Sequence, residues 1–204
     1  MRLEARVLEG SWVRLEPLGR QHLDGLRAAI QDGELWKLWV TTVPEPQELE
    51  DFLARAQERY AQGVEMPFAT IDKRSGRVAG STRFMKADPP NKRVEIGFTF
   101  LGASWQRTAI NTEAKLLMLT HAFEEWGANR VELLTDMLNA KSRAAIERLG
   151  AKHEGVLRSH MVMRQGRIRD SAMYGLIASE WPQVKAQLTS RLQQGDSPHS
   201  SERA

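Results

Sequence analysis

The sequence predicts a mixed α/β domain, of the α+β type, in which helices flank a largely antiparallel sheet. Strand-length runs rich in β-branched and aromatic residues alternate with amphipathic helical runs along the chain. Short turn sequences join consecutive strand runs in the middle and near the end, which favours antiparallel pairing there. With 204 residues, 41% hydrophobic and 27% charged, the chain is long enough for one well-buried core and short for two.

The N-terminal half opens with a strand or hairpin and continues with two helices. Residues 5–18 alternate between apolar and polar side chains, which is the pattern of a half-buried strand. Residues 19–33 and 46–63 carry apolar side chains at helical spacing, and an aromatic loop ended by prolines separates them. Three strand runs follow, divided by turn sequences, at residues 67–73, 77–87 and 92–101.

The C-terminal half begins with the clearest helix, residues 112–127, whose apolar side chains fall near one stripe before a glycine. The expected elements after it are a strand, a helix with Asn139 as candidate N-cap, a hairpin and a closing helix, at residues 129–137, 139–150, 152–163, 168–178 and 179–192. Residues 1–193 are therefore expected to form one domain. Residues 194–204 have too little apolar surface to fold and are expected to form a disordered tail.

Composition narrows the class of function. The chain has no cysteine, which excludes disulfides, thiolate metal sites and cysteine nucleophiles, and is compatible with the cytoplasm. Its 29 basic and 26 acidic residues are spread along the chain, so nucleic acid is not an expected partner. No segment approaches the ~20 apolar residues of a membrane span, so no membrane is expected. The five histidines show no metal-ligand spacing, and no metal is expected.

The stretch SWQRTAINT, residues 104–112, joins a strand to a helix in the manner of an anion-binding loop. A helix N-terminus offers unpaired N–H groups and the positive end of the helix dipole. The amides of residues 107–112 are expected to point at such an anion, helped by nearby hydroxyls and by Arg107. The alternative is that Asn111 or Thr112 only caps the helix. The glycines of a Walker loop or dinucleotide fingerprint are absent.

Four segments, taken in order, give the chain a family resemblance: VEIGFTF, INTEAKLLMLTHAFE, NAKSRAAIERLGAKHEGVLR and RDSAMYGLIASEW. Through them it resembles the GNAT superfamily of acyl-CoA-dependent N-acyltransferases over nearly its whole length. The match is best to the branch of ribosomal-protein N-terminal acetyltransferase-like proteins. The resemblance implies a GNAT-like domain with two splayed strands at the cofactor site. It also implies acetyl-CoA as co-substrate and direct acetyl transfer to a primary amine.

In that family the loop amides hold the pyrophosphate of coenzyme A. The family pattern is Gln or Arg, two residues, Gly, one residue, then Gly or Ala. Here Gln106 stands first, while Ala109 and Asn111 take the glycine positions. Ala109 adopts positive φ poorly and Asn111 more readily, so binding requires ordinary helical angles at these positions. The resemblance implies cofactor contacts from Phe98, Thr99, Phe100, Gln106, Arg107, Thr108, Ala109, Ile110, Asn111, Thr112, Asn139 and Ser142.

The resemblance also implies two catalytic residues. Glu95 is expected to take the proton of the amine, directly or through water, while the amides of residues 98–100 polarise the thioester. Its alternative is a strand-surface carboxylate paired with Arg93 or a neighbour. Ser142, in an N-x-x-S motif with Asn139, is expected to assist the departing thiolate. The alternative for Ser142 is a local bond to the preceding turn.

A tyrosine that many family members use as the acid has no counterpart at its usual position. That position is Ile146 here, which has no proton to donate, and this departure puts the identity of the acid in doubt. Tyr174 is the fallback donor, although its place in an apolar strand argues for the core.

The acceptor is expected to be a protein N-terminus, or a small amine-bearing metabolite or antibiotic. Trp36 and Trp39 are expected to wall its pocket, although packing over the sheet end explains them equally well. Glu154 and His160 are expected to meet the cationic amine. A catalytically silent acyl-CoA-binding domain is the rival hypothesis, favoured by the missing glycines and tyrosine. The sequence leaves the oligomeric state open, including a homodimer.

Overall fold

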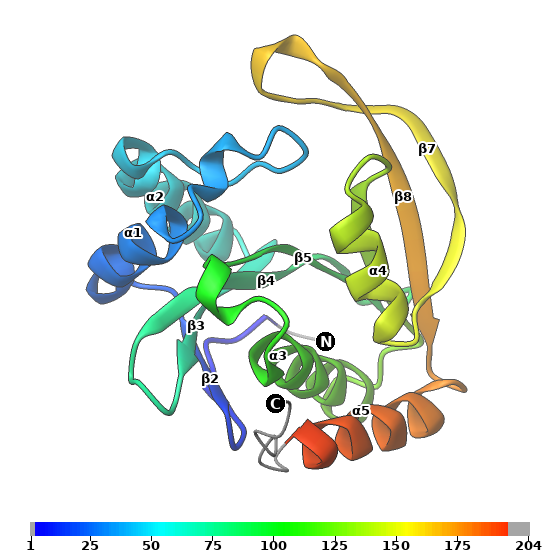
Figure 1. Cartoon of the computed structure of the whole chain (residues 1–204). Helices are drawn as coiled ribbons and strands as arrows, with labels where there is room; N and C mark the ends of the chain where they lie inside the picture. The colour runs from blue at the N-terminus through cyan, green and yellow to red at the C-terminus, as the bar shows by residue number, and fades with distance from the viewer. Residues whose placement is uncertain (1–2, 196–204) are drawn as a thin grey trace, which may run out of the picture.

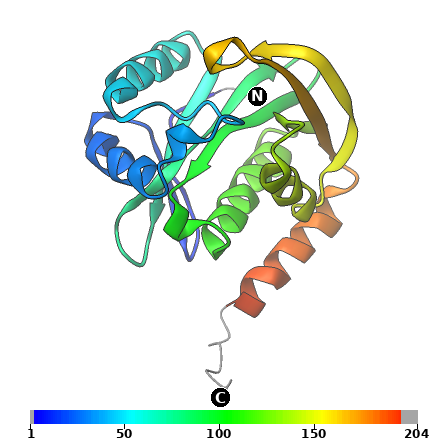
Figure 2. The same cartoon turned by 45° about the horizontal axis from the view of Figure 1, so that its top comes forward.

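The strand runs assemble into one eight-stranded sheet with helices on both faces (Figures 1 and 2). This computed structural model describes residues 3–195. The strand order is β1-β2-β3-β4-β5-β6-β8-β7, and every neighbouring pair is antiparallel except β5 and β6. The expectation of a mostly antiparallel mixed sheet flanked by helices is therefore confirmed.

The elements follow one another in the order that the sequence predicts. The strands are β1 Leu8–Glu9, β2 Val13–Pro17, β3 Glu65–Asp72, β4 Val78–Asp88, β5 Arg93–Leu101, β6 Arg130–Asp136, β7 Lys152–Val162 and β8 Ile168–Ile177. The helices are α1 Leu23–Gln31, α2 Leu49–Ala61, α3 Ala109–Thr120, α4 Ala140–Arg148 and α5 Trp181–Gly195, and a π-helical turn, His121–Glu125, extends α3. Residues 196–204, most of the expected disordered tail, lie outside the described residues.

The start of α3 differs from the prediction. The helix begins at Ala109, three residues before the expected Thr112. The side chain of Thr108 accepts a hydrogen bond from the amide of Ile110, at 3.3 Å, and thereby caps the helix. The alternative in which Asn111 or Thr112 caps the helix is therefore wrong, because both residues already lie inside it.

The sheet separates two hydrophobic cores. On one side, here called the α2 face, α1 and α2 pack against β3 and β5 through residues such as Ile71 and Phe100. On the other, here called the α3 face, α3 covers a core that includes Phe68 and Phe84, and α5 packs against α3. Figures 1 and 2 show α1 and α2 side by side, with α3 and α5 on the opposite side of the sheet. Any site between splayed strands can thus be entered from two differently built sides.

The junction of β5 and β6 is short. Arg93–Glu95 pairs in parallel with Arg130–Glu132, and no further pairs follow. Beyond that point β5 continues to Leu101 and β6 to Asp136 without pairing with each other. The two strands therefore diverge, which confirms the expected splay.

A bulge shapes β5 just beyond the junction. Phe98 has a φ of 47°, and the register with β4 shifts between the pairs Ser81↔Phe100 and Arg83↔Gly97. One extra residue is thus accommodated in β5. The Phe98 ring lies by Arg83 on the α2 face, whereas Thr99 contacts Lys115 on the α3 face. The side chains of Phe98 and Thr99 consequently lie on opposite faces of the sheet.

The sheet ends at β1 on one edge and at β7 on the other, and β7 is exposed over most of its length. Its exposed apolar side chains are Val156, Leu157, Met161 and Val162. Such an edge is suited to association with another chain. A homodimer stays a prediction.

The first turn of α3 is tied to the β1–β2 hairpin by Glu113. This buried carboxylate accepts hydrogen bonds from the backbone amides of Ser11, Trp12 and Val13, at 2.8, 2.6 and 2.7 Å. Charge-assisted bonds of this kind are stronger than neutral ones. A Cβ on Gly10 would lie 2.6 Å from both carboxylate oxygens, so only glycine leaves room for this arrangement.

We predict that Gly10→Ala lowers the free energy of unfolding by about 1–3 kcal/mol, because the added methyl group displaces the Glu113 carboxylate from its three donors. Urea unfolding followed by circular dichroism measures this change. Ser11→Ala is the matched control, since it keeps every backbone amide in place. Equal losses in the two variants would contradict the explanation.

Candidate active site

The loop before α3 reaches helical geometry earlier than the family pattern requires. Ala109 and Asn111, which stand at the glycine positions, both lie in α3. The positive φ falls instead on Arg107, at 62°. Methyl and amide side chains are therefore tolerated at 109 and 111 without backbone strain, and the condition set by the sequence for a working loop is met.

The loop presents unpaired amides at the N-terminus of α3. Within residues 3–195, the amides of Arg107, Thr108 and Ala109 donate no hydrogen bond. Gln106 fixes the loop to the end of β5 by donating from Nε2 to the carbonyl of Leu101, at 3.0 Å. A helix N-terminus with free N–H groups attracts an anion. The backbone amides of the loop can therefore hold a phosphate group. The side-chain amide of Gln106 already donates to Leu101.

Lys115, one helical turn beyond this loop, was missed in the sequence. It is 3% exposed, and its Nζ donates to Thr99 Oγ1 at 2.7 Å and to Thr82 Oγ1 at 2.9 Å. The described contacts include no carboxylate on this ammonium group, and burial lowers its pKa to about 7. Lys115 thus supports the β5 bulge through Thr99, and this support depends on whether the lysine is protonated.

Glu95 lies at the last residue of the β5–β6 junction, on the α2 face beside the bulge. It is buried, and its carboxylate forms an ion pair with Lys86 Nζ at 2.7 Å, not with Arg93. A Cβ on Gly97 would lie 3.2 Å from Glu95 Oε1, so the carboxylate runs along the strand toward the bulge. An arriving ammonium group would therefore have to compete with Lys86 for this carboxylate.

His160 and Glu95 are within electrostatic reach of each other. Burial, and then the charges of Lys86 and Arg169, lower the pKa of His160, while Glu95 acts in the opposite direction. His160 Nδ1 lies 2.9 Å from Ser171 Oγ. A neutral imidazole beside a carboxylate can accept a hydrogen bond from an ammonium group. The two residues therefore influence each other electrostatically, and a shared contact with the acceptor stays a prediction.

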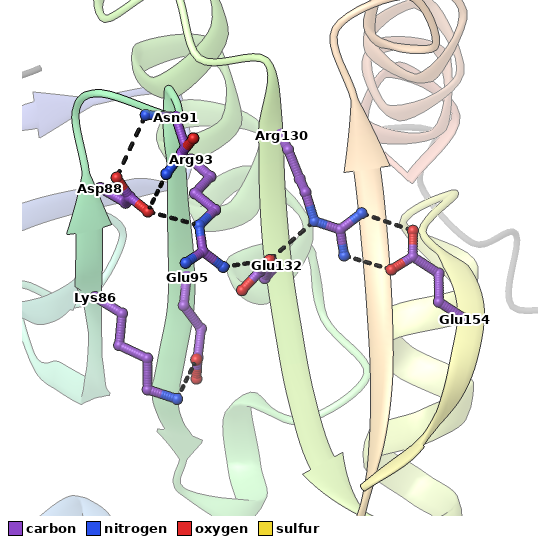
Figure 3. Close-up of polar contacts among 8 residues, drawn as sticks. All are labelled: Lys86, Asp88, Asn91, Arg93, Glu95, Arg130, Glu132 and Glu154. Atoms are coloured by element: carbon purple, nitrogen blue, oxygen red, sulfur yellow. Dashed lines mark hydrogen bonds and ion pairs between the residues drawn. The ribbon is translucent and has the colours of Figure 1, made fainter.

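Glu154 belongs to a different set of contacts. A chain of ion pairs runs across β4, β5, β6 and β7 through Asp88, Arg93, Glu132, Arg130 and Glu154 (Figure 3). The pKa of Arg130 is raised by its hydrogen bonds with Glu154 and by those with Glu132. In turn, Arg130 lowers the pKa of Glu154. Figure 3 shows Glu95 apart from this chain, bound to Lys86. Contact between Glu154 and an acceptor stays a prediction without geometric support.

Asn139 and Ser142 form the start of α4. Asn139 Oδ1 accepts a hydrogen bond from the Ser142 amide, at 3.0 Å, and thereby caps the helix as predicted. Within the described chain the Ser142 hydroxyl makes no hydrogen bond, so it is available to a ligand.

The fallback donor Tyr174 is committed elsewhere. It is buried, and its hydroxyl donates to Glu147 Oε1 at 2.8 Å and accepts from Arg143 Nε at 3.2 Å. Burial raises the pKa of Tyr174, which makes it a poorer acid. The placement agrees with a core role.

The loop between α1 and α2 meets the β7–β8 hairpin tip across the α2 face. Trp39 is exposed, and Arg167 lies over its ring, 4.8 Å from the centroid, while also pairing with Asp136. Arg164 of the same tip binds carboxylates before α2, Glu45 and Glu48, each at 2.7 Å. Trp36, in contrast, packs against the α2-face core. Trp36 thus serves packing, and a role of Trp39 in the wall of an acceptor pocket stays a prediction.

Metal and membrane features can be assessed for the same residues. Among residues 3–195, no group of three or more His, Asp or Glu side chains is placed to hold a metal ion. None of the helices in that range is both long and apolar enough to cross a bilayer.

Comparison with known proteins decides the family. A domain model described as the Acetyltransferase (GNAT) domain matches residues 13–152. The chain belongs to the GNAT acetyltransferase family. It is similar to YdaF of Bacillus subtilis (strain 168), provisionally named a ribosomal N-acetyltransferase, with 33% identity over 106 residues. That match covers 52% of this chain and 57% of YdaF, so the chain spans little more than half of that relative.

Solved structures share the fold over a greater length. A GCN5-related N-acetyltransferase from Brucella melitensis is 38% identical, with a TM-score of 0.85, and the match covers 94% of this chain and 87% of that one. Mycobacterium smegmatis RimJ, in complex with CoA-disulfide, is 20% identical with a TM-score of 0.74, over 92% of each chain, which shows the fold alone.

We predict that Lys115→Met changes the pH dependence of stability. The Lys115 pKa is about 7 in the folded chain and 10.5 ordinarily, so between these values the unfolded chain binds more protons. The parent therefore gains stability as pH rises, by about 1.4 kcal/mol per unit from this group, and the variant lacks this gain. The free energy of unfolding of the variant, relative to that of the parent, is therefore highest below pH 7 and falls toward pH 10.

Urea unfolding of parent and variant between pH 6 and 9.5 measures the difference. The exposed Lys141→Met is the control, for which a constant difference is expected. A constant difference for Lys115→Met as well would mean that this lysine does not lose its charge on folding.

Proposed function

We propose that this chain is an acetyl-CoA-dependent N-acetyltransferase that moves the acetyl group directly to a primary amine. The observation that carries the proposal is the divergence of β5 and β6 beyond Glu95, with the bulge at Phe98 on one side and the free amides before α3 at its end. In a GNAT chain these are the parts that hold a thioester and a pyrophosphate. The absence of cysteine favours direct transfer over an acyl-enzyme.

The donor side follows from the loop and the bulge. The amides of residues 107–109 would hold the pyrophosphate, and the amides of Phe98 to Phe100 would face the thioester carbonyl as its oxygen gains charge. The CoA-disulfide in complex with RimJ, which has this fold, supports the choice of cofactor. Asn139 and Ser142 lie at the N-terminus of α4, and the free Ser142 hydroxyl would hydrogen-bond the departing sulfur.

The acceptor side follows from Glu95 and its neighbours. An incoming ammonium group competes with Lys86 for the Glu95 carboxylate, which then takes the proton directly or through water. His160 would receive a second hydrogen bond, and Trp39 would wall the entrance. The similarity to YdaF supports a protein N-terminus, such as that of a ribosomal protein, as acceptor, in the cytoplasm. Small amines are the other acceptors to be tested.

We predict that Ala109→Glu weakens coenzyme A binding at least tenfold, ~1.4 kcal/mol, because a carboxylate in the first turn repels the pyrophosphate. The same charge favours the helix dipole, so α3 itself is not weakened. Ala109→Gly should change affinity little, since residue 109 has helical angles. Calorimetric titration measures both. Equal affinities for Ala109→Glu and the parent would place the pyrophosphate elsewhere.

We predict that Glu95→Gln keeps acetyl-CoA binding and lowers turnover by about 10²–10⁴-fold near neutral pH. The loss should shrink as pH rises, because the acceptor amine then deprotonates by itself. Thiol release measured with peptides and small amines between pH 6.5 and 9.5 gives the profile. A raised KM with unchanged kcat would instead indicate that Glu95 only attracts the cationic amine. Binding without turnover of any amine by the parent would favour the silent acyl-CoA-binding domain.

A further inference from the structure

An open pocket of about 570 Å³ lies on the α2 face. One face of α2 forms a wall of it, with Phe52, Arg55 and Arg59 at helical spacings of three and four residues. Phe98 of the β5 bulge and Arg164 of the hairpin tip line it as well. The pocket therefore adjoins the place where the proposed function puts the thioester, on the acceptor side.

Arg83 of β4 lines this pocket and is 4% exposed. Its Nη1 donates to Glu65 Oε2 at 2.6 Å, and its guanidinium lies 4.3 and 5.1 Å from the ring centroids of Phe98 and Phe52. Its Nε and Nη2 are buried and have no hydrogen-bond partner within residues 3–195. Buried donors without partners are rare in folded proteins, and they indicate an acceptor group that belongs there.

The charges around Arg83 do not balance. The Glu65 carboxylate is shared between Arg83 and Arg59, whose Nε lies 3.2 Å from Oε1. Arg55 forms no ion pair among the described residues. The lining holds four arginines, Arg55, Arg59, Arg83 and Arg164, and three carboxylates, Glu48, Glu58 and Glu65. Arg164 is bound by Glu45, outside the lining, as well as by Glu48, so the uncompensated donors are those of Arg55 and Arg83. The pocket consequently favours an anionic group over a cationic one.

The strand register gives the distance between this pocket and the proposed base. Glu95 is paired with Met85, and the next pair on the same side is Gly97 with Arg83. Diagonal neighbours in antiparallel strands lie ~7–8 Å apart, and an extended peptide advances ~3.3–3.6 Å per residue. An acceptor with its amine at Glu95 thus reaches Arg83 about two residues further on. Phe98 is 39% exposed, so its ring has room to turn away from Arg83 as the acceptor enters.

We propose that this pocket binds a carboxylate of the acceptor, about two residues away from the amine that is acetylated. The position of the amine rests on the proposed function, whereas the preference for a carboxylate rests on Arg83 and its neighbours. A guanidinium binds a carboxylate through paired N–H donors, which would satisfy the free nitrogens of Arg83. The carboxylate belongs either to an acidic side chain near a peptide N-terminus or to a small amino acid or dipeptide.

The test uses two peptides that are identical except for Glu or Gln at the third position. Their Kd values are measured with coenzyme A present, and their kcat/KM values with acetyl-CoA. We expect the Glu peptide to bind at least tenfold more tightly and to be turned over with at least tenfold higher kcat/KM. Free glutamate and glutamate dipeptides form a second arm, and a preference for them would identify the small-molecule source of the carboxylate.

Two variants assign the preference to the pocket. Arg55→Gln and Arg83→Lys should each reduce the preference for Glu over Gln several-fold, and Arg83→Lys keeps the positive charge that Glu65 requires in the folded chain. Arg20→Gln, an exposed arginine paired with Glu50 outside the pocket lining, is the control and should leave the ratio unchanged.

The outcomes separate this inference from the proposed function. Equal affinity for the two peptides overturns the carboxylate subsite, even where acetyl transfer is observed. A preference that persists unchanged in both Arg55→Gln and Arg83→Lys overturns it as well. Tighter binding of the Glu peptide without turnover of any amine supports the subsite and overturns acetyl transfer.

Discussion

The parallel pairing of β5 with β6 over only three residues on each strand is the constraint from which the candidate site follows. It joins the antiparallel strands β1–β5 to the unit β6-β8-β7. The ion pairs from Asp88 to Glu154 reinforce it, since a network with shared partners holds better than isolated surface pairs. The strands are paired at one end only and diverge beyond it, where the bulge at Phe98 lies in β5.

The order of elements could be predicted because it depends on local patterns. Alternation, helical spacing and turn residues were enough to place each strand and helix within a few residues. The start of α3 was missed because the capping bond of Thr108 depends on how the loop turns at Arg107. A positive φ at an arginine has no local sequence signal comparable to a glycine. The absence of glycine at positions 109 and 111 therefore does not distort the loop, because the positive φ lies at Arg107.

The candidate site could be predicted only where the family pattern names a residue. Glu95 and His160 interact electrostatically, whereas Glu154 pairs with Arg130 and Trp36 packs against the α2-face core. Lys115 had a signal, since it falls three residues before Met118 and seven before Ala122 on the buried stripe of α3. Arg83 had none, because its importance depends on Glu65 and Phe98, which are distant in the chain and meet it only in the folded sheet.

The contacts of the β7–β8 hairpin tip bear on the rate of product release. Arg164 and Arg167 attach that tip to the segment between α1 and α2, more than one hundred residues away in the chain. The attachments of Arg164 are partly exposed ion pairs, which dissolved salt screens. A bulky product that left between the hairpin tip and the α1–α2 segment would require these two segments to part. For the function proposed above, higher ionic strength would then favour release of a large product, whereas release of a small product would be unaffected.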